Sequence, residues 1–141
     1  MISVTSFGKL DSPLRDRYLQ RLKKLIPFDW REIPVKQMPS QRPPRLLGEE
    51  EKFLKEHKEF YLLDVEGKDL NSEAFRNFCF SASNRHLVVG PAVGFHPEFF
   101  KQAKGRIKLS SLTLTHELAQ IMLAESIYRS VCLEKNHPFA K

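Results

Sequence analysis

The chain has 141 residues, of which 41% are hydrophobic and 28% charged, and its formal net charge is +6. This composition excludes an intrinsically disordered chain and favours one globular domain, residues 1–141, while the charge favours an anionic partner such as RNA. The longest apolar run, residues 87–95, is too short to cross a bilayer. Met1 leads straight into a strand-like segment, so we expect a cytoplasmic protein that does not bind a membrane.

The first segments of the chain predict a strand, a helix and a second strand. Residues 2–7 alternate apolar and polar side chains, which is typical of a strand. Ser12 and Pro13 are typical of a helix N-cap and of the first helical residue, and Pro27 ends the helix that they begin. The second strand is predicted at residues 30–35.

The middle of the chain repeats this alternation after a loop. Residues 36–44 contain three prolines and no aromatic side chain, which predicts a mobile basic loop. A second helix is predicted from Leu46, followed by a buried parallel strand at residues 60–65 and a turn at residues 66–68. Asn71 is then placed to cap a third helix.

The remaining segments complete a regular order of strands and helices. Strands are predicted at residues 87–89 and 106–109, and Pro97 opens a short helix between them. A long helix follows His116. Strict alternation with short connections predicts an α/β fold in which helices cover both faces of a parallel sheet.

The last helix is apolar on more than one side. Its apolar residues, between Leu118 and Leu133, do not form a single stripe. A helix of this kind is buried on two sides, so we expect one side to pack on the sheet and the other on a second subunit. The alternative is a central core helix within a monomer.

Cysteine and histidine spacing favours no metal site. Cys79 and Cys132 match neither a metal nor a redox motif and are interpreted as buried thiols. The histidines are scattered and form no ligand pair, so no metal is expected.

Three loops follow three buried strands, at residues 64–68, 90–94 and 110–115. The carboxyl ends of parallel strands meet at one edge of the sheet, which predicts a ligand site there. The loops carry neither a dinucleotide fingerprint nor a phosphate-binding lysine. Apolar Leu112 and Leu114 suit a neutral ring such as adenine better than a polyphosphate.

Several segments, spread over almost the whole chain, resemble the SPOUT-class methyltransferases that modify N3 of a pseudouridine in 23S ribosomal RNA. The most specific is the Leu-Ser-x-Leu-Thr-Leu-x-His block at residues 109–116. The other matching segments are residues 4–10, 63–68, 88–95, 124–129 and 136–139.

This resemblance implies an α/β SPOUT fold with a parallel sheet and a C-terminal trefoil knot. It also implies S-adenosyl-L-methionine as cofactor, a homodimer in which one subunit's tail reaches the partner's cofactor, and a stem-loop of the helix 69 type in the large ribosomal subunit as substrate. The residues that it assigns to the cofactor are Leu63, Gly90, Gly94, Leu109, Ser110, Ser111, Leu112, Thr113 and Leu114.

The same resemblance assigns the substrate-facing residues. His137, or a water held by the backbone, would accept the N3 proton, and Arg129, Phe139 and Lys141 would contact RNA, together with basic residues of the loop at 36–45. Two of these residues also have a simpler interpretation. Arg129 could instead form an ion pair with Glu125, four residues earlier, and His137 could instead be an exposed residue of the tail. His116 is interpreted as packing at the helix N-terminus.

The chain departs from the family pattern at three positions. Pro91 stands where a second glycine is usual, and Phe139 and Ala140 replace the tyrosine and final histidine of the tail. These changes motivate a rival hypothesis, an RNA-binding or ribosome-binding homologue whose catalysis is impaired. A flavodoxin-like binder of a small molecule is a second rival.

Overall fold

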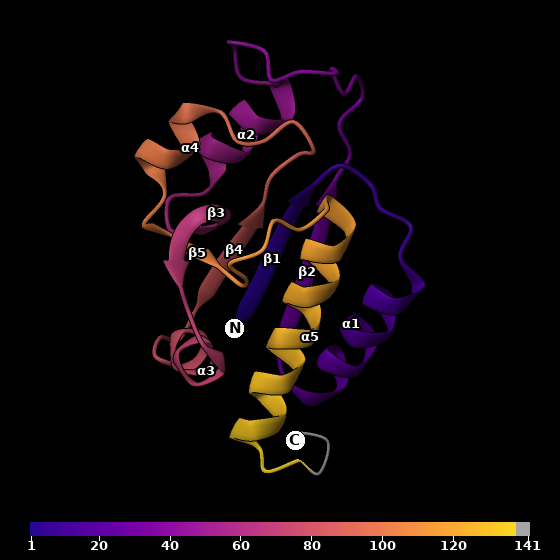
Figure 1. Ribbon diagram of the computed structural model, residues 1–141, viewed down its shortest axis with the longest axis vertical. Coiled ribbons are helices and arrows are strands. Elements are labelled where there is room, and N and C mark those ends of the chain that lie inside the picture. The colour runs from indigo at the N-terminus through magenta and orange to yellow at the C-terminus, as the bar shows by residue number, and fades with distance from the viewer. Residues whose placement is uncertain (138–141) are drawn as a thin grey trace.

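All five strands of the sheet run parallel. The computed structural model describes residues 1–137. Its strands are β1 (Ile2–Phe7), β2 (Phe28–Ile33), β3 (Tyr61–Asp69), β4 (Arg85–Val89) and β5 (Gly105–Lys108). They lie in the order β2-β1-β4-β3-β5 (Figure 1). The predicted parallel α/β sheet is confirmed.

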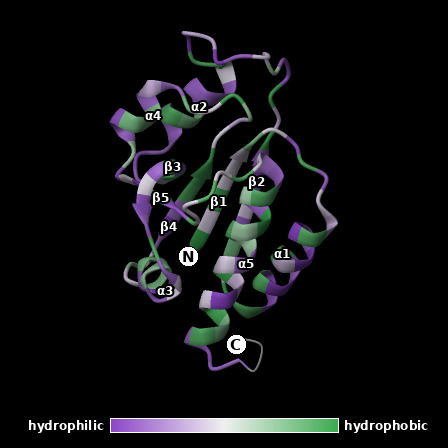
Figure 2. Ribbon diagram, in the orientation of Figure 1, coloured by the Kyte–Doolittle hydropathy of each residue, from purple (hydrophilic) through white to green (hydrophobic). Residues whose placement is uncertain are grey.

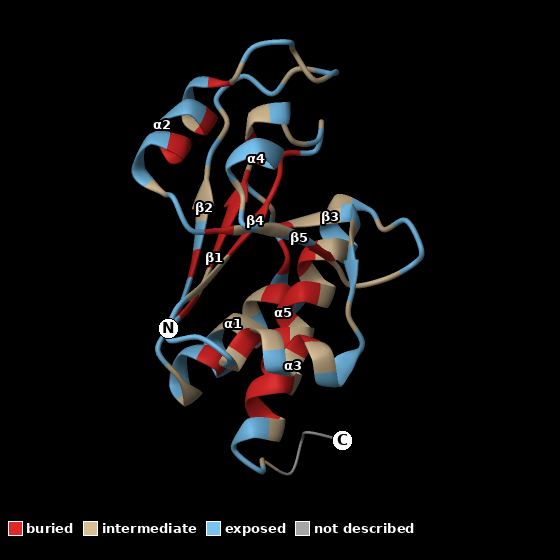
Figure 3. Cartoon of the chain, turned by 90° about the vertical axis from the view of Figure 1, so that its left-hand side faces the viewer, coloured by how far each residue is buried: buried red, intermediate tan, exposed pale blue. Residues whose placement is uncertain are grey.

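Helices cover both faces of this sheet, as predicted. They are α1 (Pro13–Leu25), α2 (Gly48–Glu56), α3 (Ser72–Phe80), α4 (Pro97–Gln102) and α5 (His116–Glu134). α5 packs between α1 and α3 on one face, and α2 and α4 lie on the other (Figure 3). The two faces bury separate apolar clusters, one around Leu87 and Leu123 and the other around Phe7, Phe53 and Phe99.

Local sequence signals explain where several helices begin. The Ser12 hydroxyl accepts the backbone N–H of Arg15, and the Asn71 side chain accepts that of Ala74, so both predicted N-caps are confirmed. Several boundaries differ from prediction by one or two residues, and both ends of β2 are examples. β2 begins two residues earlier, because Phe28 already pairs with Ile2, and it ends before Pro34.

β3 is longer than its apolar pattern indicates. The predicted strand ended at Val65 in a turn, whereas the observed strand continues to Asp69. Leu63 and Lys68 both pair with Ile107, so the residues between them form a bulge beside β5. Val65 is 67% exposed, which corrects its predicted burial. An apolar pattern cannot reveal a bulge of this kind, because the extra residues of β3 do not pair with residues of β5.

The two cysteines are free and buried, as predicted. Burial raises the pKa of the Cys79 thiol to about 12, with a small opposing effect from Arg85. The Cys79 thiol therefore lacks the thiolate character of a reactive cysteine.

Hydrogen bonds hold the C-terminal part of the Pro-rich segment at residues 36–44 against the rest of the protein. The Arg42 guanidinium donates to both carboxylate oxygens of Glu50, each at 2.6 Å, and to the Gly94 carbonyl at 3.1 Å. The His96 ring contacts the Pro44 carbonyl at 2.8 Å. Arg42 is therefore engaged within the protein, and contact between RNA and the basic residues of the loop at 36–45 stays a prediction.

Acidification is expected to destabilise the protein through His86. Its ring lies 2.8 Å from the Thr5 hydroxyl and 5.0 Å, between centroids, from the His57 ring. Burial first, and then the neighbouring His57, lower the pKa of His86 to about 4, from an ordinary value of 6.5. The folded state therefore favours the neutral ring. The neutral His86 ring contributes its full share to the free energy of unfolding above pH 6.5, and this contribution is lost as the pH falls from 6.5 to 4.

The His86→Asn variant tests this expectation. Urea unfolding at pH 7 and at pH 4.5 should show a smaller loss of stability on acidification in the variant than in the parent protein. Equal losses in the two proteins would show that His86 is not the responsible group.

Candidate functional site

A cavity of about 300 Å³ lies where β4 and β5 end and where β3 begins its bulge. β3 lies between β4 and β5 in the sheet, so its bulge is next to the loops that leave those two strands. The predicted meeting of the loops after β4 and β5 is confirmed, whereas the predicted loop at residues 64–68 is part of β3. The residues lining the cavity are Leu63, Asp64, Val65, Val89, Gly90, Pro91, Ala92, Gly94, Phe95, Lys108, Leu109, Ser110, Leu112, Leu114, His116 and Ala119.

The loop after β4 depends on two glycines. A Cβ on Gly90 would lie 3.0 Å from the Phe95 ring, so the missing side chain lets that ring close the loop. Gly94 has φ +89°, a conformation that side chains disfavour, and its N–H donates to the Pro91 carbonyl at 2.8 Å. The loop therefore folds back on itself and presents backbone to the cavity.

The loop after β5 leads directly into α5. The Leu112 N–H donates to the Ser110 hydroxyl at 2.9 Å, and the Thr115 hydroxyl caps α5 by accepting the Leu118 N–H at 3.2 Å. Leu112 is 76% exposed. An exposed leucine at the rim of a cavity offers apolar contact to a bound ring.

Few charged groups line the cavity. Asp64 pairs with Arg106 at 3.1 Å, and its side chain is only 16% exposed. Lys108 and His116 also line the wall. Burial first, and then the Arg15 charge, lower the pKa of His116, which favours the neutral ring. One lysine in a mostly apolar wall is poorly suited to hold a polyphosphate, in agreement with the sequence-based expectation.

The structure brings together most of the residues expected to bind a cofactor. The predicted residues that line the cavity are Leu63, Gly90, Gly94, Leu109, Ser110, Leu112 and Leu114. Ser111 and Thr113 are exposed and belong to the same loop, but they do not line the wall. Cofactor contact by any of these residues stays a prediction.

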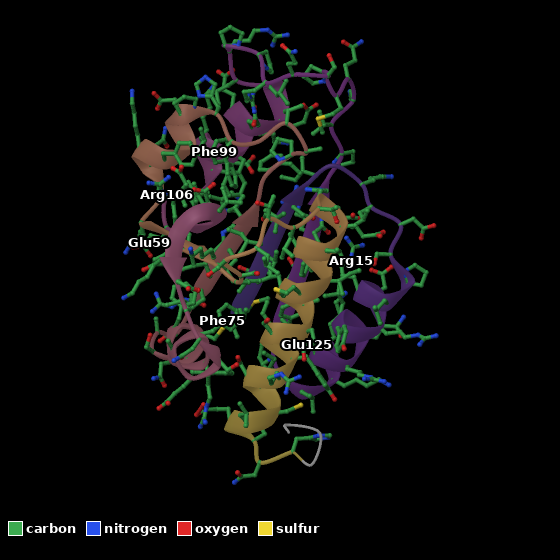
Figure 4. All side chains as sticks on the ribbon, viewed as in Figure 1. Arg15, Glu59, Phe75, Phe99, Arg106 and Glu125 are labelled. Carbon is green, nitrogen blue, oxygen red and sulfur yellow. The ribbon has the colours of Figure 1, made fainter. Side chains whose placement is uncertain are left out.

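Arg129 and His137 lie away from this cavity within one chain. Arg129 pairs with Glu125 at 3.0 Å, and neither residue lines the cavity; Figure 4 labels Glu125 near the middle of α5. His137 follows α5, and its N–H donates to the Cys132 carbonyl. The 19 residues of α5 place roughly 28 Å between its two ends. Phe139 and Lys141 lie outside the described residues.

Sequence analysis missed three polar side chains of the cavity, Asp64, Lys108 and His116. Asp64 directly follows the apolar residues that begin β3, which is a usable signal for a site residue. His116 was interpreted as packing at the helix N-terminus, whereas it lines the cavity and contacts Gln120 at 3.1 Å. Helical spacing alone predicts its contact with Gln120, whereas its place in the cavity wall depends on the fold.

A family described as "Predicted SPOUT methyltransferase" matches residues 1–139. The chain belongs to the SPOUT methyltransferase family. Among its relatives is the ribosomal RNA large subunit methyltransferase H of Ligilactobacillus salivarius. The two sequences are 30% identical, and their alignment covers 99% of each chain. The protein of that name from Francisella philomiragia is 29% identical and covers 89% of this chain and 87% of its own.

Other relatives match a shorter stretch of this SPOUT chain. The ribosomal RNA large subunit methyltransferase H of Aliarcobacter butzleri is 38% identical over 79 residues, which are 56% of this chain. This alignment spans about half of that relative, 52% of its length.

Residues 1–137 of the SPOUT chain contain no group of three or more histidine, cysteine or acidic side chains arranged to hold a metal ion. Within the same residues, every helix is too short or too polar to span a lipid bilayer.

Proposed function

We propose that this protein transfers a methyl group from S-adenosyl-L-methionine to N3 of a pseudouridine in 23S ribosomal RNA. The observation that carries the proposal is the cavity at the carboxyl edge of the sheet, built by the loops that match the family. The names of the relatives support an RNA substrate in the large ribosomal subunit. Such a substrate implies action in the cytoplasm.

The cavity residues fit the proposed cofactor. Leu109, Leu112 and Leu114 offer apolar contact to an adenine ring, and the Gly90 and Ser110 backbones lie at the same wall. Asp64 supplies a carboxylate for the cationic end of the cofactor. When bound, S-adenosyl-L-methionine supplies a methyl group already activated on a sulfonium.

The protein's main task is then to position the reactants. The target base must be unstacked to reach the cavity, and the proton on its N3 must be accepted by a nearby group. We assign the proton to His137 or to a water held by the backbone, and phosphate or base contacts to Arg129, Phe139 and Lys141. The roles of His137, Phe139 and Lys141 require the tail to approach a cavity.

A homodimer would supply that tail. Because α5 separates His137 from the cavity of its own chain, we assign the tail of one subunit to the cavity of its partner. Leu118 is 51% exposed, and Ile121 and Met122 are only half-buried, which leaves apolar surface on α5 for a second copy. Figure 2 shows hydrophobic residues along the whole of α5. The trefoil knot stays a prediction.

Labelled methyl transfer tests the proposed function. Purified protein is incubated with S-adenosyl-L-methionine carrying a labelled methyl group and with ribosomes that lack the modification. We expect label in 23S RNA. RNA binding without label favours the non-enzymatic homologue, whereas the absence of cofactor binding in calorimetry favours the flavodoxin-like binder. Light scattering should report a dimer at micromolar concentration, and a monomer would contradict the shared site.

Gly90→Ala is expected to weaken binding of S-adenosylhomocysteine about tenfold while changing stability little. The added Cβ would meet the Phe95 ring at 3.0 Å, so the ring must shift within the cavity wall. Isothermal titration calorimetry measures the affinity. The double variant Gly90→Ala/Phe95→Leu removes the collision and should recover part of the lost affinity. Unchanged affinity in Gly90→Ala would argue against a cofactor at this loop.

A further inference from the structure

A buried arginine organises polar side chains beside the cavity. Arg15 on α1 is only 3% exposed. Its guanidinium donates to the Leu10 carbonyl at 3.0 Å, to Glu32 at 3.3 Å and to the Gln120 side-chain oxygen at 2.5 Å. Figure 4 shows Arg15 beside α5. The side chain is therefore fixed by partners from three segments of the chain.

Arg15 determines how the Gln120 amide is oriented. Gln120 is completely buried on α5. A guanidinium can only donate hydrogen bonds, so the atom of Gln120 that faces Arg15 must be the oxygen Oε1. The amide nitrogen Nε2 then points the other way, and it lies 3.1 Å from Nε2 of His116.

The orientation of Gln120 in turn determines the His116 tautomer. An amide nitrogen donates and does not accept, so Nε2 of His116 must accept this hydrogen bond. In a neutral imidazole the proton then resides on Nδ1. The lowered pKa of His116, which follows from burial and from the Arg15 charge, agrees with a neutral ring.

The protonated nitrogen remains available to a ligand. His116 lines the cavity, and its only hydrogen bond within residues 1–137 is the one to Gln120. Every buried side-chain nitrogen or oxygen in those residues has a partner, so an Nδ1 without one must be accessible. A neutral donor at this wall suits an oxygen or nitrogen acceptor of a bound molecule.

We infer that Arg15 and Gln120 hold His116 as the Nδ1–H tautomer, and that this N–H donates a hydrogen bond to an acceptor atom of the cofactor. Arg15 and Gln120 are positioning residues, and His116 is a cofactor-binding residue. The inference rests on the proposed function only for the identity of the ligand. The tautomer is a property of the free protein.

The tautomer is tested without cofactor. Protein labelled with ¹⁵N-histidine gives long-range ¹⁵N–¹H spectra that distinguish the two neutral tautomers, and the signals absent from His116→Asn assign the residue. We expect Nδ1–H in the parent protein. A proton on Nε2 there overturns the inference.

Gln120→Glu provides the matched perturbation. A carboxylate beside Arg15 stays ionised and only accepts hydrogen bonds, so Nε2 of His116 must now carry a proton. The spectrum should change to the Nε2–H tautomer or to the imidazolium. An unchanged spectrum in a variant that circular dichroism shows to be folded would mean that Gln120 does not set the tautomer.

Two substitutions of His116 test the contact with the cofactor. The Asn side-chain amide occupies the place of Nδ1, whereas the longer Gln amide occupies that of Nε2. We expect His116→Asn to bind S-adenosylhomocysteine within about threefold of the parent and His116→Gln to bind about tenfold more weakly. Equal affinities for the two variants overturn the contact. If the parent protein itself binds no S-adenosylhomocysteine, the contact fails together with the proposed function, while the tautomer result stands.

Discussion

Replacing Arg42 with methionine is expected to lower the free energy of unfolding by about 3–5 kcal/mol. Arg42 holds both carboxylate oxygens of Glu50 at 2.6 Å, and the Glu50 side chain is completely buried. Methionine keeps an aliphatic chain but removes the charge. The buried carboxylate is then left with the Leu47 N–H as its remaining donor. Urea unfolding followed by circular dichroism measures the change.

Arg45→Met is the matched control for this variant. Arg45 belongs to the same segment and is exposed, and its side chain makes only a 3.5 Å contact with the Leu46 carbonyl. We expect its stability to change by less than about 0.5 kcal/mol. Arg42→Met/Glu50→Gln removes both charges and should recover part of the loss. Equal midpoints for Arg42→Met and Arg45→Met would contradict a strong buried pair.

The Arg42 pair also bears on the cavity. The same guanidinium donates to the carbonyl of Gly94, which lines the cavity, at 3.1 Å. The segment around Arg42 therefore supports the loop after β4. Loss of the pair should disturb that loop as well as the protein's stability.

Replacing Gly67 with valine is expected to destabilise the protein by about 3 kcal/mol or more and to abolish cofactor binding. A Cβ at this position would lie 2.6 Å from the backbone N and C of Ile107 and 2.8 Å from the backbone C of Arg106. Backbone atoms in a strand cannot move aside as a flexible side chain can. The pairing of β3 with β5 must therefore open, which displaces the loop at residues 109–115. Thermal unfolding and calorimetry with S-adenosylhomocysteine measure the two effects.

Gly48→Ala controls for the loss of a glycine. Gly48 begins α2, and a Cβ there would meet nothing within 4 Å. We expect a change of less than about 1 kcal/mol, in the stabilising direction, because alanine favours helix. If Gly67→Val melts at the same temperature as Gly48→Ala, β3 and β5 do not approach as closely as described.

The sequence predicts the architecture well because its signals are local. Alternating or continuous apolar runs indicate the strands, and caps such as Ser12 and Asn71 mark where helices begin. The meeting of the loops after β4 and β5 at one edge follows from parallel strands alone. The bulge in β3 does not follow, because it depends on the close approach of Gly67 to β5.

The parts of the site that sequence analysis missed depend on distant partners. Arg42 belongs to the loop whose basic residues were expected to contact RNA, and only the fold reveals the buried carboxylate of Glu50 that holds it. Gln120 and His116 share a helix turn, but the orientation of their hydrogen bond comes from Arg15, 105 residues away from Gln120. The approach of the tail to a partner's cavity was expected from the resemblance and stays a prediction.

The central claim is methylation of N3 of a pseudouridine in 23S ribosomal RNA. Its most direct test is nucleoside mass spectrometry of this RNA, taken from ribosomes of a strain that lacks the gene and then treated with the purified protein and S-adenosyl-L-methionine. We expect one additional methyl group on a pseudouridine, with none after treatment with Gly67→Val. An unmodified pseudouridine after treatment with protein that binds the cofactor, or a methyl group on a different nucleoside, would contradict the claim.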